Sequence, residues 1–451
     1  MDGHAGVVDS VHGGLTMSRR LAALALAAVA GVAPVAVAPT ARADEPASHF
    51  TVLDQFAFPT ADLTSAEPIV DPSHHVIYSR YADTSEVVAI NYQSQAVTDF
   101  PNIDAASLVL NPQTHDLYAP GMMRVDGKHT GLVVVRGTQV RATYPFSHLD
   151  GYGLSAVNEF DGTVAVLVSR LVRTKRVTLT LVELDGTKII RSTRVCGIHG
   201  GEGVNNHEMA FDASTGRLYI ECPGHGHNRP HPELEIYKGG DQVGTIDSVP
   251  NGQLVMDSGH SYLYVVGQSA ATVVRGFHVE AQGPLGTANG AAFDVEKTLL
   301  DPVNGNLYVS DAGRRSGALS SQVAILHGRH VPLVMSTGGA QLGLDPDSGL
   351  VYVSRERGQE PDPTPGHGVQ VIDGTTMQPQ IDSTTSVLSF DPVTGDVLGS
   401  NPDGMTAIHG QAVAETVGQA MADPQLITPI PGHDRVVTIG DGWVTRFATT
   451  A

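Results

Sequence analysis

A short turn motif, flanked by strand-like hydrophobic runs, recurs along the chain from about residue 70 onwards. In its clearest copies an Asp or Asn, often followed by Pro, precedes a few turn residues and then a hydrophobic residue with a tyrosine, as in residues 71–78, 111–118, 212–219, 301–308 and 345–352. Weaker copies begin near Asp161, Asp257, Asp391 and Gly432. Pro fixes φ, Asp accepts from the backbone beyond it and Gly adopts positive φ, so the flanking runs are predicted to be antiparallel neighbours.

Successive motifs start 40 to 51 residues apart, and each is followed by a second pair of β-rich runs, such as 86–90 and 96–98. About four strands per repeat at this spacing are typical of β-propeller blades. We therefore predict an all-β fold, a single β-propeller over residues 44–451. The motif count is nine, but propellers usually have four to eight blades, so we expect eight within a range of seven to nine.

The propeller prediction also says how the ring closes. The run 50–58 is expected to supply the outer strand of the last blade, whose own inner strands are expected at 425–430, 436–439 and 443–447. Such closure hides sheet edges that would otherwise favour aggregation.

Composition supports this fold and excludes two other classes of protein. The 50 Gly and 27 Pro, with only 16% charged residues, are incompatible with a long helical bundle or coiled coil. The net charge is −20, and no basic stripe is present that could neutralise phosphates. Nucleic acid is therefore not an expected partner.

The N-terminus has the pattern of an export signal. Arg19 and Arg20 follow Met17, residues 21–38 are almost wholly apolar, and a small-x-small site ends at Ala43. We assign residues 1–43 to a signal peptide, with Met17 as a possible true start and the twin-arginine route left open. The chain after residue 43 has a net charge of −21 and no other segment long enough to span a bilayer. A secreted, extracytoplasmic location is expected.

Cys196 and Cys222 are the only cysteines. An even count in an oxidising compartment predicts a disulfide between them. Two thiolate metal ligands are the alternative.

The strand order within a blade predicts which loops share a face. The repeated turns join the first and second strands and should lie on one face, whereas second-to-third loops and crossings between blades should lie on the other, where loops are longer. Residues 196–208 form such a crossing and residues 221–233 such a loop. Five of the 18 histidines after residue 43 fall within 199–231, where an even spread would give one or two. His74 and His75 lie in a repeated turn, on the other face.

Imidazole and carboxylate groups in glycine- and proline-rich segments are ligands that Zn²⁺ takes. The His-x-His spacing of the loop lets two rings converge without a helix. We therefore predict a zinc site with the candidate ligands His148, His199, Glu202, His207, His225 and His227. The alternatives are an ordinary exposed polar loop over 223–231 and a strand cap at His207 and Glu208.

The repeated turn with its hydrophobic–Tyr pair resembles that of the YVTN group of β-propellers, over residues 60–445, and the single tryptophan argues against the WD type. This resemblance implies the architecture and no activity.

Residues 144–225 resemble a second family more locally, the periplasmic zinc chaperones with a propeller fold that hand zinc to the solute-binding protein of an ABC importer. The similarity rests on Ser147-His148, on an Asp-Gly-Thr-Lys turn at 185–188, on Cys196-x-x-His199-Gly200 with Glu202, and on Cys222. It implies zinc ligation by His148 and His199, a Cys196–Cys222 bridge and a metal-importer partner. Gly201 interrupts the family's His-Gly-Glu run, and a His-rich segment after Ala43 is missing.

Two other functions remain open. A metal-dependent propeller lactonase or lyase would use His199 or His207 as general base, although no recognised catalytic spacing is present. A binding scaffold without metal would use long loops such as 355–368.

Overall fold

Thirty-six short β-strands make up the part of the chain that the computed structural model describes, and none of the described residues form a helix that could span a bilayer. All of them lie in the unit Ser48–Ala451; the other unit, Met1–Ala47, contains the predicted export signal, which lies outside the described residues. The described residues are 50–58, 63, 68–123, 129–146, 154–159, 161–171, 176–200, 208–222, 232–247, 249–285, 293, 295–311, 321–328, 333–337, 339, 341–354, 368–383, 385–401, 404–418, 426–440 and 443–450.

The strands form consecutive groups of four, each an antiparallel blade. In order they are β2 (Ile69–Asp71), β3 (Val76–Arg80), β4 (Glu86–Asn91) and β5 (Ala96–Ala105); β6 (Val109–Leu110), β7 (Leu117–Met123), β8 (His129–Arg136) and β9 (Gln139–Phe146); β10 (Leu154–Val157), β11 (Thr163–Leu171), β12 (Arg176–Asp185) and β13 (Lys188–Gly200); β14 (Met209–Asp212), β15 (Arg217–Cys222), β16 (Glu233–Lys238) and β17 (Asp241–Asp247); β18 (Gln253–Asp257), β19 (Tyr262–Val266), β20 (Ala270–Arg275) and β21 (His278–Pro284); β22 (Val295–Leu300), β23 (Asn306–Asp311), β24 (Gln322–His327) and β25 (Leu333–Ser336); β26 (Gln341–Asp345), β27 (Leu350–Ser354), β28 (Gln370–Asp373) and β29 (Thr376–Met377); β30 (Ser386–Asp391), β31 (Asp396–Asn401), β32 (Gly404–His409) and β33 (Ala412–Gly418); and β34 (Leu426–Pro429), β35 (Arg435–Gly440) and β36 (Trp443–Thr449) with β1 (Phe50–Ala57).

The all-β propeller prediction is confirmed. Hydrogen bonding among the described strands gives eight sheets, and grouping these strands by four gives nine blades, within the expected range of seven to nine. One of these sheets contains two blades, because the end of β5 pairs with β7, and the blades counted by strands match the nine motifs of the sequence. Gly121 makes this junction possible, since a Cβ there would lie 2.0 Å from the backbone oxygen of Asp104.

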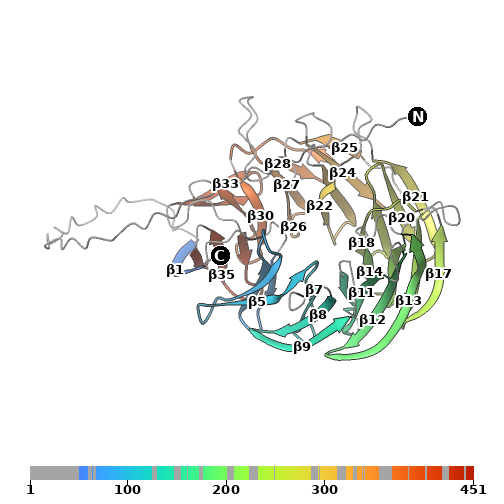
Figure 1. Ribbon diagram of the computed structural model, residues 1–451. Coiled ribbons are helices and arrows are strands. Elements are labelled where there is room, and N and C mark those ends of the chain that lie inside the picture. The colour runs from blue at the N-terminus through green and yellow to red at the C-terminus, as the bar shows by residue number, and fades with distance from the viewer. Residues whose placement is uncertain are drawn as a thin grey trace, which may run out of the picture. The chain divides into compact units, whose positions relative to one another are not determined.

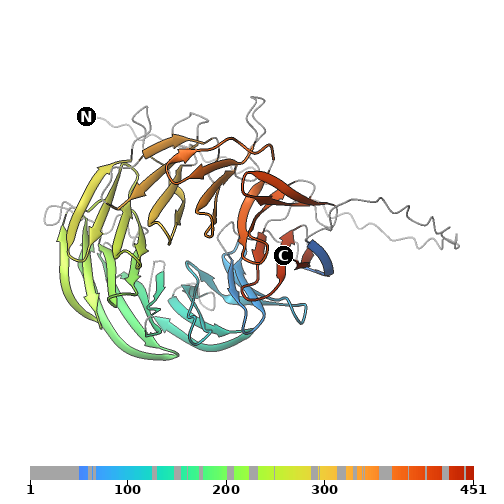
Figure 2. The same ribbon diagram turned by 180° about the vertical axis from the view of Figure 1, so that it is seen from behind.

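Consecutive blades pack face to face around a ring (Figures 1 and 2). Their first strands contact one another in succession, for example β14 with β18 and β22 with β26. A cluster of buried apolar side chains fills the space between each blade and the next. The last blade joins the first in the same way, through Leu426 and Val437 on one side and Ile77 and Ile90 on the other. The hydrophobic core is therefore divided among the interfaces between blades.

Each repeated motif forms the turn between the first and second strands of a blade, as predicted; we call the rim that carries these turns the turn rim. The Asp345 side chain is buried and accepts the backbone N–H groups of Asp347 and Ser348 at 2.9 and 3.2 Å. Gly349 then takes a φ of 72°, a left-handed conformation that glycine adopts without steric cost.

The tyrosine of the motif has a role that the local pattern does not reveal. Its hydroxyl donates to the backbone carbonyl of a turn glycine in the next blade, as Tyr78 does to Gly137 at 2.9 Å. The same contact is made by Tyr118 to Gly186, Tyr219 to Gly276, Tyr308 to Gly374 and Tyr352 to Gly410. Each such tyrosine therefore ties one blade to the following one.

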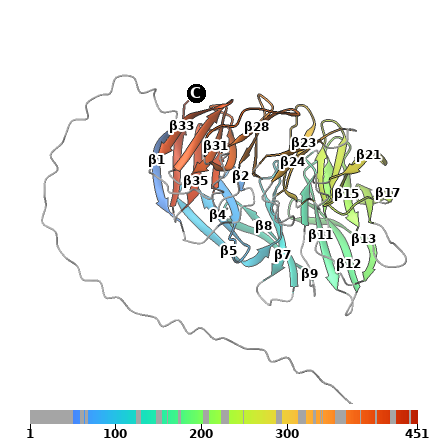
Figure 3. The same ribbon diagram turned by 90° about the horizontal axis from the view of Figure 1, so that it is seen from above.

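The ring closes as predicted, because β1 pairs antiparallel with β36 and completes the last blade. Figure 3 shows β1, in blue, on the side of the ring where the C-terminal strands, in red, lie. Arg446 of β36 binds both carboxylate oxygens of Asp54 in β1 and donates to the Tyr92 carbonyl of the first blade at 2.6 Å. One guanidinium thus links the N-terminal strand, the C-terminal strand and the first blade.

Candidate functional site

The crossing at 196–208 and the loop at 221–233, which were predicted to share a face, begin at the same rim of the propeller. β13 is the fourth strand of its blade and β15 the second strand of the next. Second and fourth strands of an antiparallel blade run in the same direction, so both strands end at the rim opposite the turn rim. We call it the loop rim.

A disulfide fastens these two strand ends together. Cys196 of β13 and Cys222 of β15 are bonded, with their Cα atoms 5.3 Å apart and both side chains buried. The predicted bridge is confirmed, and since a sulfur in a disulfide offers no thiolate to a metal, the structure favours the bridge over the thiolate alternative. The bridge connects two adjacent blades.

A buried carboxylate holds the backbone at this bridge. Cys196 has a φ of 58° and lies where the pairing of β12 with β13 shifts register. Its backbone N–H, displaced from the strand ladder, donates to Glu235 Oε2 at 2.8 Å, and the Tyr237 hydroxyl donates to the same oxygen at 2.6 Å. Burial and the nearby Glu235 charge raise the pKa of Tyr237. The hydroxyl therefore stays protonated and keeps donating.

Glu235 with the two cysteines is the only group of three metal-type side chains among the described residues whose donor atoms all lie within 4.8 Å of one another. Because the two sulfurs are bonded to each other, this group is a structural support at the base of the loop rim rather than a metal centre.

Five of the six predicted ligands lie outside the described residues, and His199 lies at the end of a described strand. His148, Glu202, His207, His225 and His227 are outside the described residues. The backbone of His199 belongs to β13 and pairs with Val177, three residues beyond the bridge. Its place at the loop rim is as expected.

Two glutamates at the loop rim, Glu208 and Glu221, form a pair that the sequence analysis did not predict. Glu208 immediately precedes β14, and the backbone N–H of Glu221 in β15 donates to its carbonyl at 2.9 Å. Side chains directly opposite each other on antiparallel strands lie on the same face. Glu221 is buried, and its Oε1 accepts the backbone N–H of Gly252 at 3.0 Å. Glu208 and Glu221 therefore lie on the same face of their sheet at the loop rim.

Burial changes the acidity of both groups. It raises the pKa of Glu208 to about 7. Burial also raises the pKa of Glu221 to about 8. The hydrogen bond from the Gly252 N–H lowers this pKa, and the nearby Glu208 charge raises it further. The sequence contained a signal for the burial of Glu221. Apolar residues occupy both faces of 218–222, which is typical of a strand covered by sheets on either side. A glutamate within such a strand is expected to be covered too.

Comparisons with known proteins find only distant structural similarity to this chain. No protein-family model matches the chain, and no curated protein does. Similar solved structures include a eukaryotic initiation factor (14% identity, 84% of this chain and 93% of that one, TM-score 0.48), the β-propeller domain of Myceliophteria thermophila Cps50 (Swd1) (12%, 67% and 98%, 0.34) and the β-propeller domain of the trilobed protease from Pyrococcus furiosus (11%, 71% and 97%, 0.40).

Proposed function

We propose that this chain is an exported zinc-binding β-propeller with its metal site on the loop rim. The observation that carries the proposal is the Cys196–Cys222 bridge, which joins the origins of the two histidine-bearing segments. His199 and His225 are each the third residue beyond a bridged cysteine. Three residues span at most about 10 Å, so the chain length from each cysteine allows both imidazoles to reach a common point near the bridge.

The donor set at that point suits zinc. Neutral imidazoles and a carboxylate form the tetrahedral shells that zinc prefers. His199, His225 and His227 with Glu202 would provide four such ligands, and His148 and His207 are further candidates from neighbouring segments.

Export and delivery belong to the same proposal. A buried disulfide is typical of proteins in oxidising compartments, in agreement with the signal-peptide pattern of residues 1–43. By its resemblance to the periplasmic zinc chaperones, the chain would pass its zinc to the solute-binding protein of an ABC importer. That step requires an exposed site, as loops on a rim provide.

Zinc content of the purified full chain tests the site. We expect about one chelator-removable zinc per chain, as is usual for a single four-ligand site. The double variant His199→Ala/His225→Ala should lose it. His278→Ala removes an exposed histidine at the start of β21 and should keep the metal. Unchanged zinc in the double variant would show that the ion, if any, lies elsewhere.

A further inference from the structure

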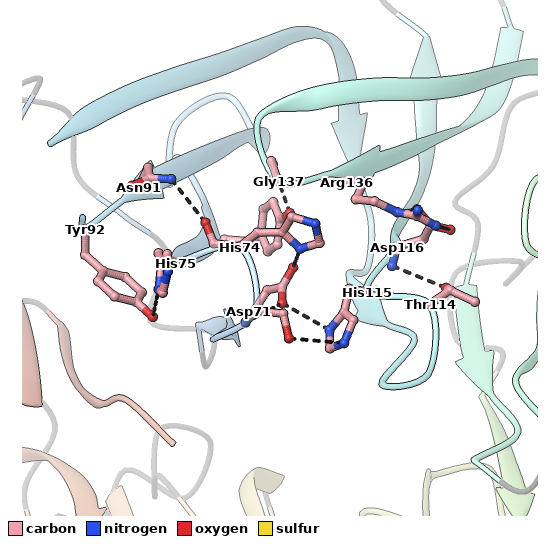
Figure 4. Close-up of polar contacts among 12 residues, drawn as sticks. Asp71, His74, His75, Asn91, Tyr92, Thr114, His115, Asp116, Arg136 and Gly137 are labelled. Carbon is pink, nitrogen blue, oxygen red and sulfur yellow. Dashed lines mark hydrogen bonds and ion pairs between the residues drawn. The ribbon is translucent and has the colours of Figure 1, made fainter. Parts of the chain in front are cut away.

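A second constellation of polar side chains lies on the turn rim, where the first two blades meet (Figure 4). Asp71 is fully buried, and two histidines converge on its carboxylate: His74 Nδ1 lies 2.6 Å from Oδ2, and His115 Nδ1 lies 3.1 Å from Oδ1. The Ser73 backbone N–H also donates to Oδ1 at 3.2 Å. Two hydrogen bonds, from His74 and the Ser73 backbone, and one close contact with His115 therefore surround this carboxylate.

The other nitrogen of one of these rings reaches a serine. His115 Nε2 lies 3.1 Å from Ser73 Oγ, and the Ser73 side chain is exposed. Serine hydroxyl, imidazole and buried carboxylate thus form a chain, in the order that activates serine nucleophiles. The His115 ring is turned so that its Nδ1 contact with Asp71 is not aligned as a hydrogen bond, and such contacts commonly tighten only when substrate binds.

The backbone at His115 is strained for this residue type. Its φ is 57°, as at His75 and Ser261 at the equivalent place in their own turns, whereas Gly305, Gly349 and Gly395 occupy that place in others. A non-glycine residue there costs roughly 1 kcal/mol.

One equivalent turn shows what the histidine adds. Asp257 and His260 repeat the pairing of Asp71 with His74, at 2.8 Å. A Cβ on Gly305 would lie 2.9 Å from His260 Nδ1 and 3.0 Å from Asp257 Oδ2, so Gly305 faces that pair as His115 faces its own. Only the imidazole of His115 extends this arrangement to a serine. Turn structure alone is therefore satisfied without it.

A metal site at the same place is disfavoured. Asp71, His74 and His115 are not among the described side chains whose donor atoms all lie within 4.8 Å of one another. The two imidazoles approach opposite oxygens of the carboxylate rather than a common point.

We propose that Ser73 and His115 are the nucleophile and general base of a serine esterase site, with Asp71 as the residue that positions His115. Ser73 Oγ attacks the acyl carbon of a carboxylic ester while its proton moves to His115 Nε2. The carbon–oxygen bond to the alcohol breaks, and the alcohol leaves with that proton. Water then attacks the acyl-serine by the same route, releasing the acid and restoring Ser73. The site lies on the rim opposite the proposed zinc site and is independent of it.

Hydrolysis of p-nitrophenyl acetate by the full chain, and labelling by a fluorophosphonate probe with peptide mapping, test the site together. We expect the label on Ser73, and a loss of kcat/KM of at least ~100-fold in Ser73→Ala and His115→Gly. His115→Gly installs the residue that several equivalent turns use at this positive φ, including Gly305 and Gly349, so it should melt no lower than the parent. Asp71→Asn, assayed below its melting temperature, should lower kcat with KM unchanged.

Two matched changes serve as controls. Ser214→Ala removes an exposed serine at the equivalent turn position, where its Oγ contacts Asp212, and His260→Ala removes the histidine of the equivalent pair. Both should hydrolyse the ester as the parent does. No labelling of Ser73, hydrolysis unchanged in Ser73→Ala or His115→Gly, or hydrolysis abolished by a chelator would each overturn the assignment.

Discussion

The hydroxyl of Tyr352 donates a hydrogen bond to the carbonyl of Gly410, 2.8 Å away, across the boundary between two blades. Tyr352 is fully buried in β27, and Gly410 takes a φ of 58° in the turn between β32 and β33. The repetition of this contact around the propeller explains why the sequence motif ends in tyrosine. The aromatic ring of the tyrosine fills the interface between blades, and its hydroxyl donates to a turn carbonyl of the next blade.

Tyr352→Phe isolates the polar part of that contact. The aromatic ring stays, and the half-buried Gly410 carbonyl loses its donor, so we expect the free energy of unfolding to fall by about 1 kcal/mol in urea titrations. Tyr262→Phe is the control, because that ring is only half-buried and faces the Arg275 guanidinium at 5.6 Å. A Tyr352→Phe midpoint equal to the parent's would mean that the hydroxyl contributes nothing.

The link through Arg446 predicts the strength of ring closure. In Arg446→Ala the Asp54 carboxylate and the Tyr92 carbonyl both lose a charged donor, which should cost about 2 kcal/mol. Arg141→Ala, an exposed position on β9, should cost little. Urea is the denaturant to use, because guanidinium salts screen ion pairs. Equal losses in the two variants would show that closure does not depend on this residue.

Reduction of the disulfide should loosen two adjacent blades together. The bridge spans a sequence separation of 26 residues, for which the chain-entropy model gives about 3 kcal/mol. The melting temperature of the parent should therefore fall in strong reductant to that of Cys196→Ser/Cys222→Ser. The double variant should melt at the same temperature with and without reductant; a shift there would point to an effect unrelated to the bridge.

Glu221 should make stability depend on pH in a defined direction. Its pKa is raised to about 8 in the fold, whereas an unfolded glutamate titrates near 4.3. Between these values the folded chain binds the extra proton, so stability falls as pH rises from about 4.5 to about 8. Glu221→Gln mimics the protonated form, still accepts from Gly252, and should flatten that fall. Glu159→Gln, at an exposed position, should leave the slope unchanged.

Local chemistry explains what could be predicted from the sequence. Asp345 and Gly349 shape a turn within five residues, and repetition of that turn gave the blade architecture and the closing strand at 50–58. Contacts between distant segments could not be predicted in this way. The junction of β5 with β7 depends on Gly121 lying against Asp104, and the buried Glu221 carboxyl accepts its hydrogen bond from Gly252, 31 residues further along the chain. The ligand candidates of the loop rim remain a prediction, whereas their anchor at Cys196 and Cys222 is confirmed.

Bound zinc should stabilise the fold and do so in a pH-dependent way. A ligand that binds only the folded state adds about 2.7 kcal/mol at a concentration 100 times its Kd. The melting temperature should therefore rise with added zinc at pH 7.5. The rise should vanish near pH 5, because imidazole ordinarily titrates near pH 6.5 and its protonated form cannot ligate. His199→Ala/His225→Ala should melt alike with and without zinc at both pH values, while His278→Ala should respond as the parent does. A zinc response that survives at pH 5 would require carboxylates in place of imidazoles as the main ligands.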